Sequence, residues 1–541
     1  MIFRPRLLDE LRDYDRGKFL SDLSAGLTVA AVALPLAMAF AIASGLKPEA
    51  GLFTAIVAGF LISALGGSRV QIGGPAGAFV VVVYAIVERY GIPNLLLATM
   101  MAGVLLLLMG AFRLGNLVRF VPVSIVIGFT NGIAVLIILS QLRPFLGLRI
   151  EQMPADFFLM LRALAQAAPS ADAVTIALGV VSLGLIWGWP RLWRSAQGAP
   201  ARALRHVPGT IVGLAAGTAA VLLLDLQVET IGSRFGGIPQ SLPPVAWPHV
   251  GWPELSLLFG PAFTIALLGS IESLLCARVA DAVIGDRHDP NQELMAQGIA
   301  NIAAPLLGGF CATGTIARTM TSVRSGAKTP VAGIVHALCL LVVMLVAAPV
   351  AKHIPLATLA AILIYVAYHM GEWREFARLR QFSNYYRLIL LSTFVLTVVV
   401  DLTVAVQVGL VLACLFFIAR VSGLTRVDAV ESPQAGVEAY RISGSLFFGA
   451  VSKMDVLLDP RRPLPRVLIL DLSQLLNMDT SGLEALQTLH GMLQKHGGAL
   501  ILAGVQAQPK GLLARSGLLE KLGASNVVAS LADAWECARQ A

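Results

Sequence analysis

The segment Cys311-Ala-Thr-Gly-Thr-Ile-Ala-Arg318 places a guanidinium within a run of small residues. A carboxylate is equally isolated upstream, because Glu272 is the only charge between residues 261 and 277. A charge at bilayer depth costs roughly 2.5–3.5 kcal/mol even on the milder insertion scales, so such residues usually face a cavity that serves an ion or a substrate. The two charges therefore indicate transport.

Composition and the length of the apolar runs predict an integral membrane protein. The chain of 541 residues is 57% hydrophobic and 13% charged, whereas about 25% of a soluble domain is charged. The neutral run 23–46 alone exceeds the ~20 residues that a spanning helix needs. The net charge of +8 comes from cations that flank apolar runs, without a basic and aromatic stripe, so no nucleic-acid partner is expected. The five cysteines lack CxxC spacing and predict neither disulfides nor a metal site.

Apolar windows predict fourteen membrane segments over residues 23–420, after a charged segment at 1–22. The loops after even-numbered segments hold most of the arginines, for example Arg191 and Arg374, although Arg149 lies in an opposite loop. By the positive-inside rule, both termini are then cytoplasmic in a multi-pass protein of the inner (plasma) membrane. The windows are 23–46, 51–65, 75–87, 94–112, 121–142, 172–189, 208–224, 261–284, 292–307, 314–323, 330–350, 355–370, 387–402 and 403–420.

Two of these windows are too short to cross a bilayer. Windows 75–87 and 314–323 would span about 20 Å and 15 Å as helices, against a hydrocarbon core of ~30 Å. They are third and tenth, the matching positions in two halves of seven, and both begin in helix-averse sequence such as Gly73-Gly-Pro-Ala-Gly-Ala78. This pattern is typical of an inverted-repeat transporter with its site at the midplane. Unpaired N–H groups at the starts of two half-helices favour an anion over a cation.

The two isolated charges suit different roles in such a site. Burial favours the neutral form of a carboxylate, so Glu272 is a candidate proton carrier that binds and releases a proton during turnover. Arg318 keeps its proton and would supply a fixed positive potential or a direct anion contact. The alternative is a static pairing of Glu272 with Arg318 that only holds two helices together.

A small α/β domain is predicted at 437–541, after a linker at 421–436 that contains Gly and Pro. Short β-rich runs at 437–448, 467–471 and 499–504 alternate with a helix at 481–495, and none is long enough to span a membrane. Asp479-Thr-Ser-Gly-Leu483 joins a strand to that helix. We expect Ser or Thr there to cap the helix; a phosphorylation site at Ser481 is the less favoured alternative.

Five motifs together resemble the SulP anion transporters, the sulfate-permease family. The resemblance implies fourteen segments in two inverted repeats of seven, as in the uracil permeases, with segments 1–4 and 8–11 forming a mobile core and segments 5–7 and 12–14 a gate. It also implies a cytoplasmic STAS domain, a homodimer with elevator-like motion, and a role for the STAS domain in dimer contacts or regulation by a cytoplasmic partner. The motifs are Ala33-Leu-Pro-Leu-Ala-Met-Ala-Phe-Ala41, Gly74-Pro-Ala-Gly-Ala78, Ser270-Ile-Glu-Ser-Leu-Leu275, Arg318-Thr-Met-Thr-Ser-Val-Arg-Ser-Gly-Ala-Lys-Thr329 and Asp479-Thr-Ser-Gly-Leu483.

The resemblance also implies the residues of the anion site, with Glu272 facing it. Sodium-coupled bicarbonate members resemble this chain but carry Asp and Thr where Glu272 and Cys276 stand. Because cysteine offers no hard oxygen ligand to Na⁺, the coupling ion is expected to be H⁺. The sequence around Glu272 is most similar to that of bacterial proton-coupled members, some of which carry C4-dicarboxylates. The implied anion-site residues are Phe40, Ala76, Gly77, Gly314, Thr315, Ile316, Ala317 and Arg318.

The patterns predict a secondary transporter of a small anion without a cofactor, and the resemblance implies proton coupling and sulfate, bicarbonate or a C4-dicarboxylate as the substrate. The chain has no recognisable nucleophile motif and no GxxxxGK phosphate loop, so an enzyme or ATP-driven pump is not expected. One alternative is a passive anion channel or exchanger on the same fold, and another is a sodium-coupled bicarbonate transporter. The third is a membrane-anchored STAS signalling scaffold, which would leave the intramembrane Glu and Arg unexplained.

Overall fold

The computed structural model describes residues 3–116, 121–193, 207–247, 251–459 and 463–540. The chain forms two compact units, Met1–Leu410 and Val411–Ala541. Each unit is described by itself.

The first unit is helical, and a helix lies in each of the predicted windows. Within the described residues, eight helices have the length and apolar composition needed to cross a bilayer. The four short helices α1 (Arg6–Glu10), α7 (Phe157–Ala167), α11 (Ile231–Phe235) and α17 (Trp373–Ala377) lie between the longer elements. The helices in the windows are α2 (Arg16–Ala43), α3 (Pro48–Leu65), α4 (Gly77–Tyr90), α5 (Ile92–Ala111), α6 (Val123–Leu146), α8 (Ala173–Leu192), α10 (Gly209–Leu224), α12 (Trp252–Ile284), α13 (Pro290–Leu306), α14 (Ile316–Arg324), α15 (Val331–Ala351), α16 (Leu356–Met370), α18 (Asn384–Val399) and α19 (Leu402–Leu424).

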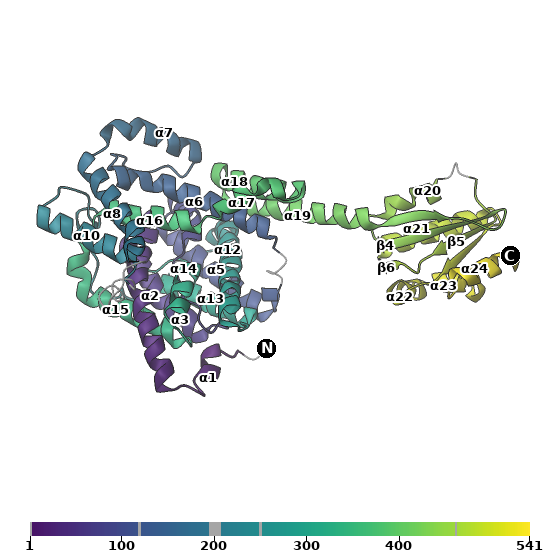
Figure 1. The fold of residues 1–541 in the computed structure, drawn as a ribbon, viewed down its shortest axis with the longest axis horizontal. Coiled ribbons are helices and arrows are strands. Elements are labelled where there is room, and N and C mark those ends of the chain that lie inside the picture. Colours follow the sequence, from purple (N-terminus) through teal and green to yellow (C-terminus); the bar gives the residue numbers. More distant parts are fainter. Residues whose placement is uncertain (1–2, 117–120, 194–206, 248–250, 460–462, 541) are drawn as a thin grey trace. The chain divides into compact units, whose positions relative to one another are not determined.

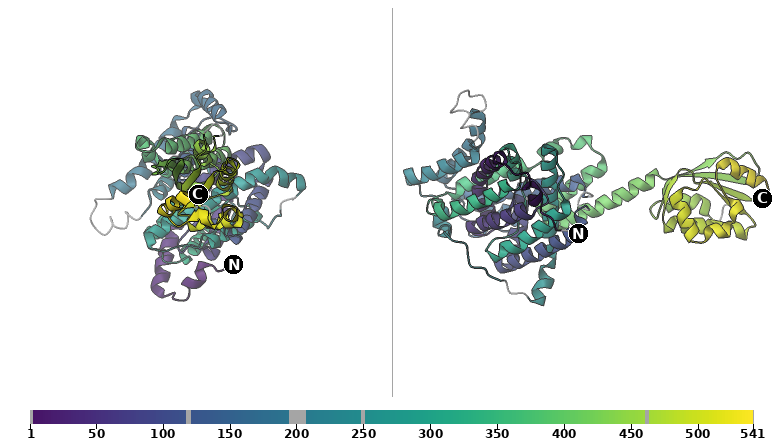
Figure 2. Two further views of the ribbon diagram at one scale, coloured as in Figure 1. Left: turned by 90° about the vertical axis from the view of Figure 1, so that its right-hand side faces the viewer. Right: turned by 90° about the horizontal axis from the view of Figure 1, so that it is seen from below.

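Contacts between these helices define two groups within the helical unit, which Figures 1 and 2 show from three directions. In the first, α13 lies along α3 and α5, α15 lies along α2 and α3, α12 contacts α5 and α14, and α4 contacts α5, α2 and α12. In the second, α16 and α18 lie along α6, and α8 packs on α10 and α16. Helices from the two halves of the sequence therefore interleave within each group. We call the first the α2–α15 group and the second the α6–α18 group.

The predicted boundary at residue 22 falls inside a helix. Helix α2 begins at Arg16, because the Asp15 side chain caps it by accepting a hydrogen bond from the Lys18 N–H at 2.7 Å. Asp22 is fully buried, and its carboxylate accepts from the backbone N–H of Lys328 at 2.6 Å and of Thr329 at 3.0 Å. These bonds stabilise the buried carboxylate of Asp22 within α2. The helix can therefore start before the apolar run begins.

The second unit contains a mixed sheet with helices on both faces. Its strands are β3 (Arg426–Val430), β4 (Val437–Leu446), β5 (Val467–Asp471), β6 (Leu475–Met478), β7 (Ala499–Ala503) and β8 (Val527–Val528). The order is β3-β4-β5-β7-β8, β6 also pairs with β4, and the β3–β4 pair is antiparallel whereas the other pairs are parallel. The helices are α20 (Asp455–Leu458), α21 (Thr480–Lys495), α22 (Ala507–Arg515), α23 (Leu518–Leu522) and α24 (Leu531–Gln540).

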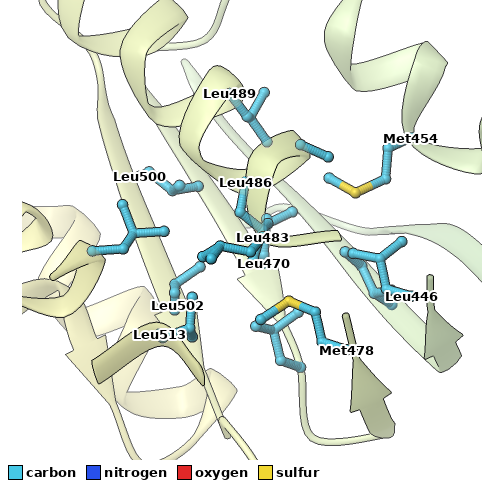
Figure 3. Packing of buried hydrophobic residues seen from close by; sticks show 14 of the residues in the cluster. Leu446, Met454, Leu470, Met478, Leu483, Leu486, Leu489, Leu500, Leu502 and Leu513 are labelled. Carbon is cyan, nitrogen blue, oxygen red and sulfur yellow. The ribbon is translucent and has the colours of Figure 1, made fainter. Parts of the chain in front are cut away.

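Alternating side chains of the central strands build two separate cores in this unit. Leu470 of β5 and Leu502 of β7 pack against Leu486 and Leu489 of α21 (Figure 3). Their neighbours in sequence point to the opposite face, where Ile469 and Ile501 pack with Ala534 and Ala538 of α24. This is the expected result of a period of two residues in strands that are covered on both faces.

Two predictions for this region need correction. The predicted linker 421–436 overlaps two regular elements: α19 continues to Leu424, and 426–430 form strand β3, which pairs with β4 along its whole length. The cap of α21 is neither Ser nor Thr. It is Asp479, whose carboxylate accepts from the Gly482 N–H at 3.0 Å.

Candidate functional site

Two short strand–helix arms cross inside the α2–α15 group. Strand β1 (Gly73–Gly74) precedes α4, and strand β2 (Thr313–Gly314) precedes α14. The strands pair antiparallel, with Gly73 opposite Gly314. Each helix starts two or three residues after its strand, so the starts of α4 and α14 are brought together from distant parts of the chain. Neither helix has a side-chain N-cap, so their first N–H groups depend on another acceptor.

Glycine is required where the arms touch. The backbone of Gly74 has φ +149°, and a Cβ there would lie 2.1 Å from Nη1 of Arg318. A Cβ on Gly314 would lie 1.6 Å from Nε2 of Gln71. A larger residue at Gly74 would have to displace the end of the Arg318 side chain, and one at Gly314 the end of the Gln71 side chain.

Arg318 extends from one arm to the other. The residue belongs to the first turn of α14, yet its Nη2 donates to the Pro75 carbonyl at 3.2 Å, just before α4 begins. The side chain is 1% exposed, and Nη1 has no hydrogen-bond partner within the described part of the chain. A fixed positive charge therefore lies beside the amino-terminal end of α4, where it adds to the positive end of the helix dipole.

Glu272 of α12 faces the arms without a cation partner. Its side chain is half-buried, and Oε2 is fully buried without a hydrogen bond from any described residue. Within the described chain no ion pair joins it to Arg318, so the static pairing considered from the sequence is absent. The carboxylate and the guanidinium are thus separate groups of one site region.

Hydrogen bonds on both sides of Glu272 fasten α12 to the arms. Thr313 Oγ1 of β2 donates to the Gly269 carbonyl at 2.9 Å, one turn before Glu272. One turn after it, Cys276 Sγ donates to Thr319 Oγ1 of α14 at 3.3 Å. These bonds fix the position of Glu272 relative to the start of α14.

The remaining predicted residues lie around the two helix starts. The Phe40 ring of α2 lies against Gly77, the first residue of α4. A Cβ added to Gly77 would be 3.4 Å from this ring. Ala76 and Thr315 precede the first residues of the two helices, and the Thr315 hydroxyl donates to the Ile72 carbonyl at 3.2 Å. Phe40, Ala76 and Thr315 are buried. Ile316 and Ala317, in contrast, are exposed at the first turn of α14.

Three polar residues that support the arms were not predicted. Gln71 Nε2 donates to Ser273 Oγ at 2.9 Å, and Thr319 Oγ1 accepts from the Ile72 N–H at 3.0 Å. Asn301 holds β2 in the manner of a neighbouring strand, because it accepts from the Ala312 N–H and donates to the Ala312 carbonyl, both at 2.8 Å. The one feature of the sequence that could have pointed to them is a polar side chain within a Gly-rich or apolar segment.

Comparison with known proteins identifies the fold. Residues 19–393 match the sulfate permease family and residues 427–534 match the STAS domain. The chain belongs to the sulfate permease family.

Members of this family align along most of the chain. YvdB of Bacillus subtilis (strain 168) is 42% identical over 527 residues, which cover 96% of this chain and 97% of YvdB. The bicarbonate transporter BicA of Picosynechococcus sp. is 31% identical over 458 residues, with 79% and 78% of the two chains covered. This sulfate permease family member is therefore a multi-pass membrane anion transporter and not an enzyme.

Solved structures show the same architecture. The structure of SLC26A9 superposes with a TM-score of 0.87 at 18% identity and covers 99% of this chain and 92% of its own, which establishes the shared fold. The transmembrane domain of a cyanobacterial BicA superposes with a TM-score of 0.66 at 31% identity and covers 73% of this chain and 98% of its own. The residues that match the sulfate permease family lie in the helical unit, and those that match the STAS domain lie in the α/β unit.

Ser481 of the STAS domain is the second residue of α21 and is half-buried. Thr480 beside it is exposed. Because Asp479 already caps the helix, the Ser481 hydroxyl is not needed as a cap, which keeps the phosphorylation hypothesis open to test.

Proposed function

We propose that the protein is a proton-coupled secondary transporter that carries a small oxyanion or carboxylate, with sulfate, bicarbonate and C4-dicarboxylates as the first candidates. YvdB has a provisional name as a sulfate transporter, and BicA is named a bicarbonate transporter. The observation that carries the proposal is the buried Arg318 guanidinium at the meeting point of two uncapped helix starts, where Nη1 has no hydrogen-bond partner and no acidic partner among the described residues. Such a place favours a ligand with negative charge.

The anion would bind between the starts of α4 and α14. Ala76, Gly77, Ile316 and Ala317 would offer backbone N–H groups at close range, because glycine and alanine leave the backbone accessible. Phe40 would close the apolar side of the site against Gly77. Gly314 and Thr315 would keep the two arms in contact, and Arg318 would supply the fixed charge.

Glu272 would carry the coupled proton. Its buried Oε2 has no donor among the described residues, so protonation would remove an uncompensated charge from the site. Proton and anion would enter together, and the carboxylate would return its proton on the other side of the membrane. Sodium coupling is less favoured, because Cys276 offers a thiol that donates to Thr319 where a cation would need a hard oxygen.

The two groups of helices suggest how the site would reach both sides of the membrane. The arms, Phe40 and Glu272 all belong to the α2–α15 group, so the complete site could move as one body. We propose that this group slides as an elevator against the α6–α18 group. The fourteen segments would form two inverted repeats of seven, with both termini cytoplasmic and the α6–α18 group as the fixed part of a homodimer.

Uptake by purified protein in liposomes tests this function. Vesicles with an imposed inward proton or sodium gradient would be offered sulfate, bicarbonate and succinate. We expect accumulation of one of these anions above equilibrium when the outside is acidic. Uptake that responds to Na⁺ but not to pH would overturn the proton assignment, and uptake that never exceeds equilibrium would indicate a channel or an exchanger.

A further inference from the structure

Amphipathic aromatic residues are concentrated in two segments of the sequence that belong to α8, α16, α17 and the start of α18. Residues 187–193 and 365–387 make up a small part of the chain, yet they hold four of its seven tryptophans and four of its eight tyrosines. The helices of the α2–α15 group carry Tyr84, Tyr90 and Trp252 only. The eight clustered residues are Trp187, Trp189, Trp193, Tyr365, Tyr368, Trp373, Tyr385 and Tyr386.

Ring contacts join three helices within this cluster. The rings of Trp187 in α8 and Tyr368 in α16 are 5.5 Å apart and nearly perpendicular. Tyr368 stacks on Trp373 of α17 at 6.4 Å, and the Trp373 indole N–H donates to the Tyr368 carbonyl at 2.7 Å. Trp187 is 38% exposed and Tyr368 49% exposed, so the ring edges remain accessible from outside.

Exposed arginines follow directly on this aromatic cluster. Residues 371–387 contain four arginines and two glutamates, which gives a net charge of +2. Arg374, Arg378 and Arg380 are exposed, and none of them forms an ion pair within the described parts of the chain. Arg387 orders the turn that carries two of them, because its side chain donates to the carbonyls of Leu379 at 2.7 Å and Arg380 at 2.6 Å.

We infer that this surface binds the phosphate headgroup of an anionic phospholipid. We call it the headgroup patch and define it as Trp187, Tyr368, Trp373, Arg374, Arg378 and Arg380. Tryptophan and tyrosine rings prefer the headgroup level of a bilayer, where one edge is apolar and the other wet. Arginine matches phosphate by paired hydrogen bonds, and these three are free to provide them.

The inference goes beyond the transport site, because the patch lies in the other group of helices. A lipid held there would fix the α6–α18 group at a constant depth in the bilayer. The α2–α15 group has no comparable cluster in its helices. The α6–α18 group would then be the fixed part of the transporter, and the α2–α15 group would remain free to move.

Lipid retention by the full-length protein tests the headgroup patch. The purified protein would be incubated with phosphatidylglycerol or with phosphatidylcholine, and bound lipid would be counted by native mass spectrometry. The test variant is R378Q/R380Q. The matched control is R149Q/R162Q, which removes two exposed arginines outside the patch, one in a loop and one in α7. Loss of one basic residue at a lipid surface weakens lipid binding about fivefold. The test variant loses two, so it should bind phosphatidylglycerol roughly 30-fold more weakly, and the control should bind it as the unmodified protein does.

Three results of the lipid measurement would overturn the inference. They are equal retention by both variants, an equal loss in both variants, and the same preference for phosphatidylcholine as for phosphatidylglycerol. A change in oligomeric state with unchanged lipid retention would also overturn it, because the patch would then contact a second copy of the chain. The single variant Arg374→Gln should weaken binding about fivefold, which gives a graded check with one charge removed.

Discussion

The β1–α4 arm and the β2–α14 arm have the same order of elements but contribute different things to the site. The first arm consists of glycine, proline and alanine up to Ala78, is buried, and offers close backbone approach next to Phe40. The second arm carries Arg318 and an exposed first turn. One arm supplies shape and the other supplies charge. Because the Arg318 guanidinium donates to Pro75 of the opposite arm, the charge also acts on the arm that has none of its own.

Loss of the charge on the second arm should have the largest effect. The substitution Arg318→Ala removes the only buried cation described beside the helix starts, at a cost of about 2–5 kcal/mol in anion binding, or roughly 30-fold or more in affinity. Anion uptake by proteoliposomes measures this. Arg318→Lys is the matched control, since it keeps the charge without the paired donors. If Arg318→Ala takes up the anion as fast as the unmodified protein, the second arm does not supply a charge that anion binding needs.

Displacement of the Arg318 side chain by a new Cβ on the first arm should have the next largest effect. In Gly74→Ala the new Cβ would meet Nη1 of Arg318 at 2.1 Å on a backbone with φ +149°. Overpacking and backbone strain of this kind each cost about 1–3 kcal/mol. We expect a lower midpoint of thermal unfolding and about tenfold slower uptake. Gly184→Ala serves as the control, because a Cβ at that position meets nothing within 4 Å.

A smaller change should follow loss of the hydroxyl that bridges β1 and α14. In Thr319→Val the buried Ile72 N–H loses its acceptor, which costs about 1–3 kcal/mol. We expect severalfold slower uptake with reduced thermal stability, and near-normal behaviour of Thr319→Ser. A valine variant as stable and active as the serine variant would remove this bond from the account.

The smallest effect is expected in the STAS domain. Burial alone would raise the pKa of Asp471, but hydrogen bonds from Ser473 and Arg441 outweigh it and hold that pKa below its usual value. The resulting stability is present above the unfolded pKa of about 3.9 and is lost as pH falls through the lower folded value. Because Arg441 is partly exposed, the contribution is at most about 1 kcal/mol.

Amide hydrogen exchange in β4 and β5 of the full-length protein measures this contribution. The variant Asp471→Asn should exchange faster than the unmodified protein at pH 7. The difference should shrink as the pH approaches 3. A difference that grows on acidification would contradict the sign of the pKa shift.

Sequence alone predicted the elements whose signal is local. Runs of apolar residues located the membrane helices, and the short windows at 75–87 and 314–323 pointed to α4 and α14 because helix length follows directly from residue count. The start of α2 at Arg16 was missed, since Asp22 is satisfied by the backbone of residues 328 and 329, more than 300 positions away.

The residues of the candidate site stay a prediction, and the contacts between them could not be predicted from the sequence. Isolation of Glu272 and Arg318 in apolar sequence was visible, whereas the bond from Arg318 to Pro75 depends on the pairing of β1 with β2. Two-residue strands leave no periodic pattern to detect. Support by Gln71, Thr319 and Asn301 was missed for the same reason, because their partners are set by tertiary contacts.

Uptake by the Glu272→Gln variant tests the central claim most directly. Proteoliposomes of this variant would be compared with the unmodified protein in two assays, concentrative uptake driven by an inward proton gradient and anion exchange without any gradient. The account predicts that proton-driven accumulation is lost while exchange persists, because Arg318 and the two helix starts still bind the anion. Full proton-driven accumulation by Glu272→Gln would contradict it.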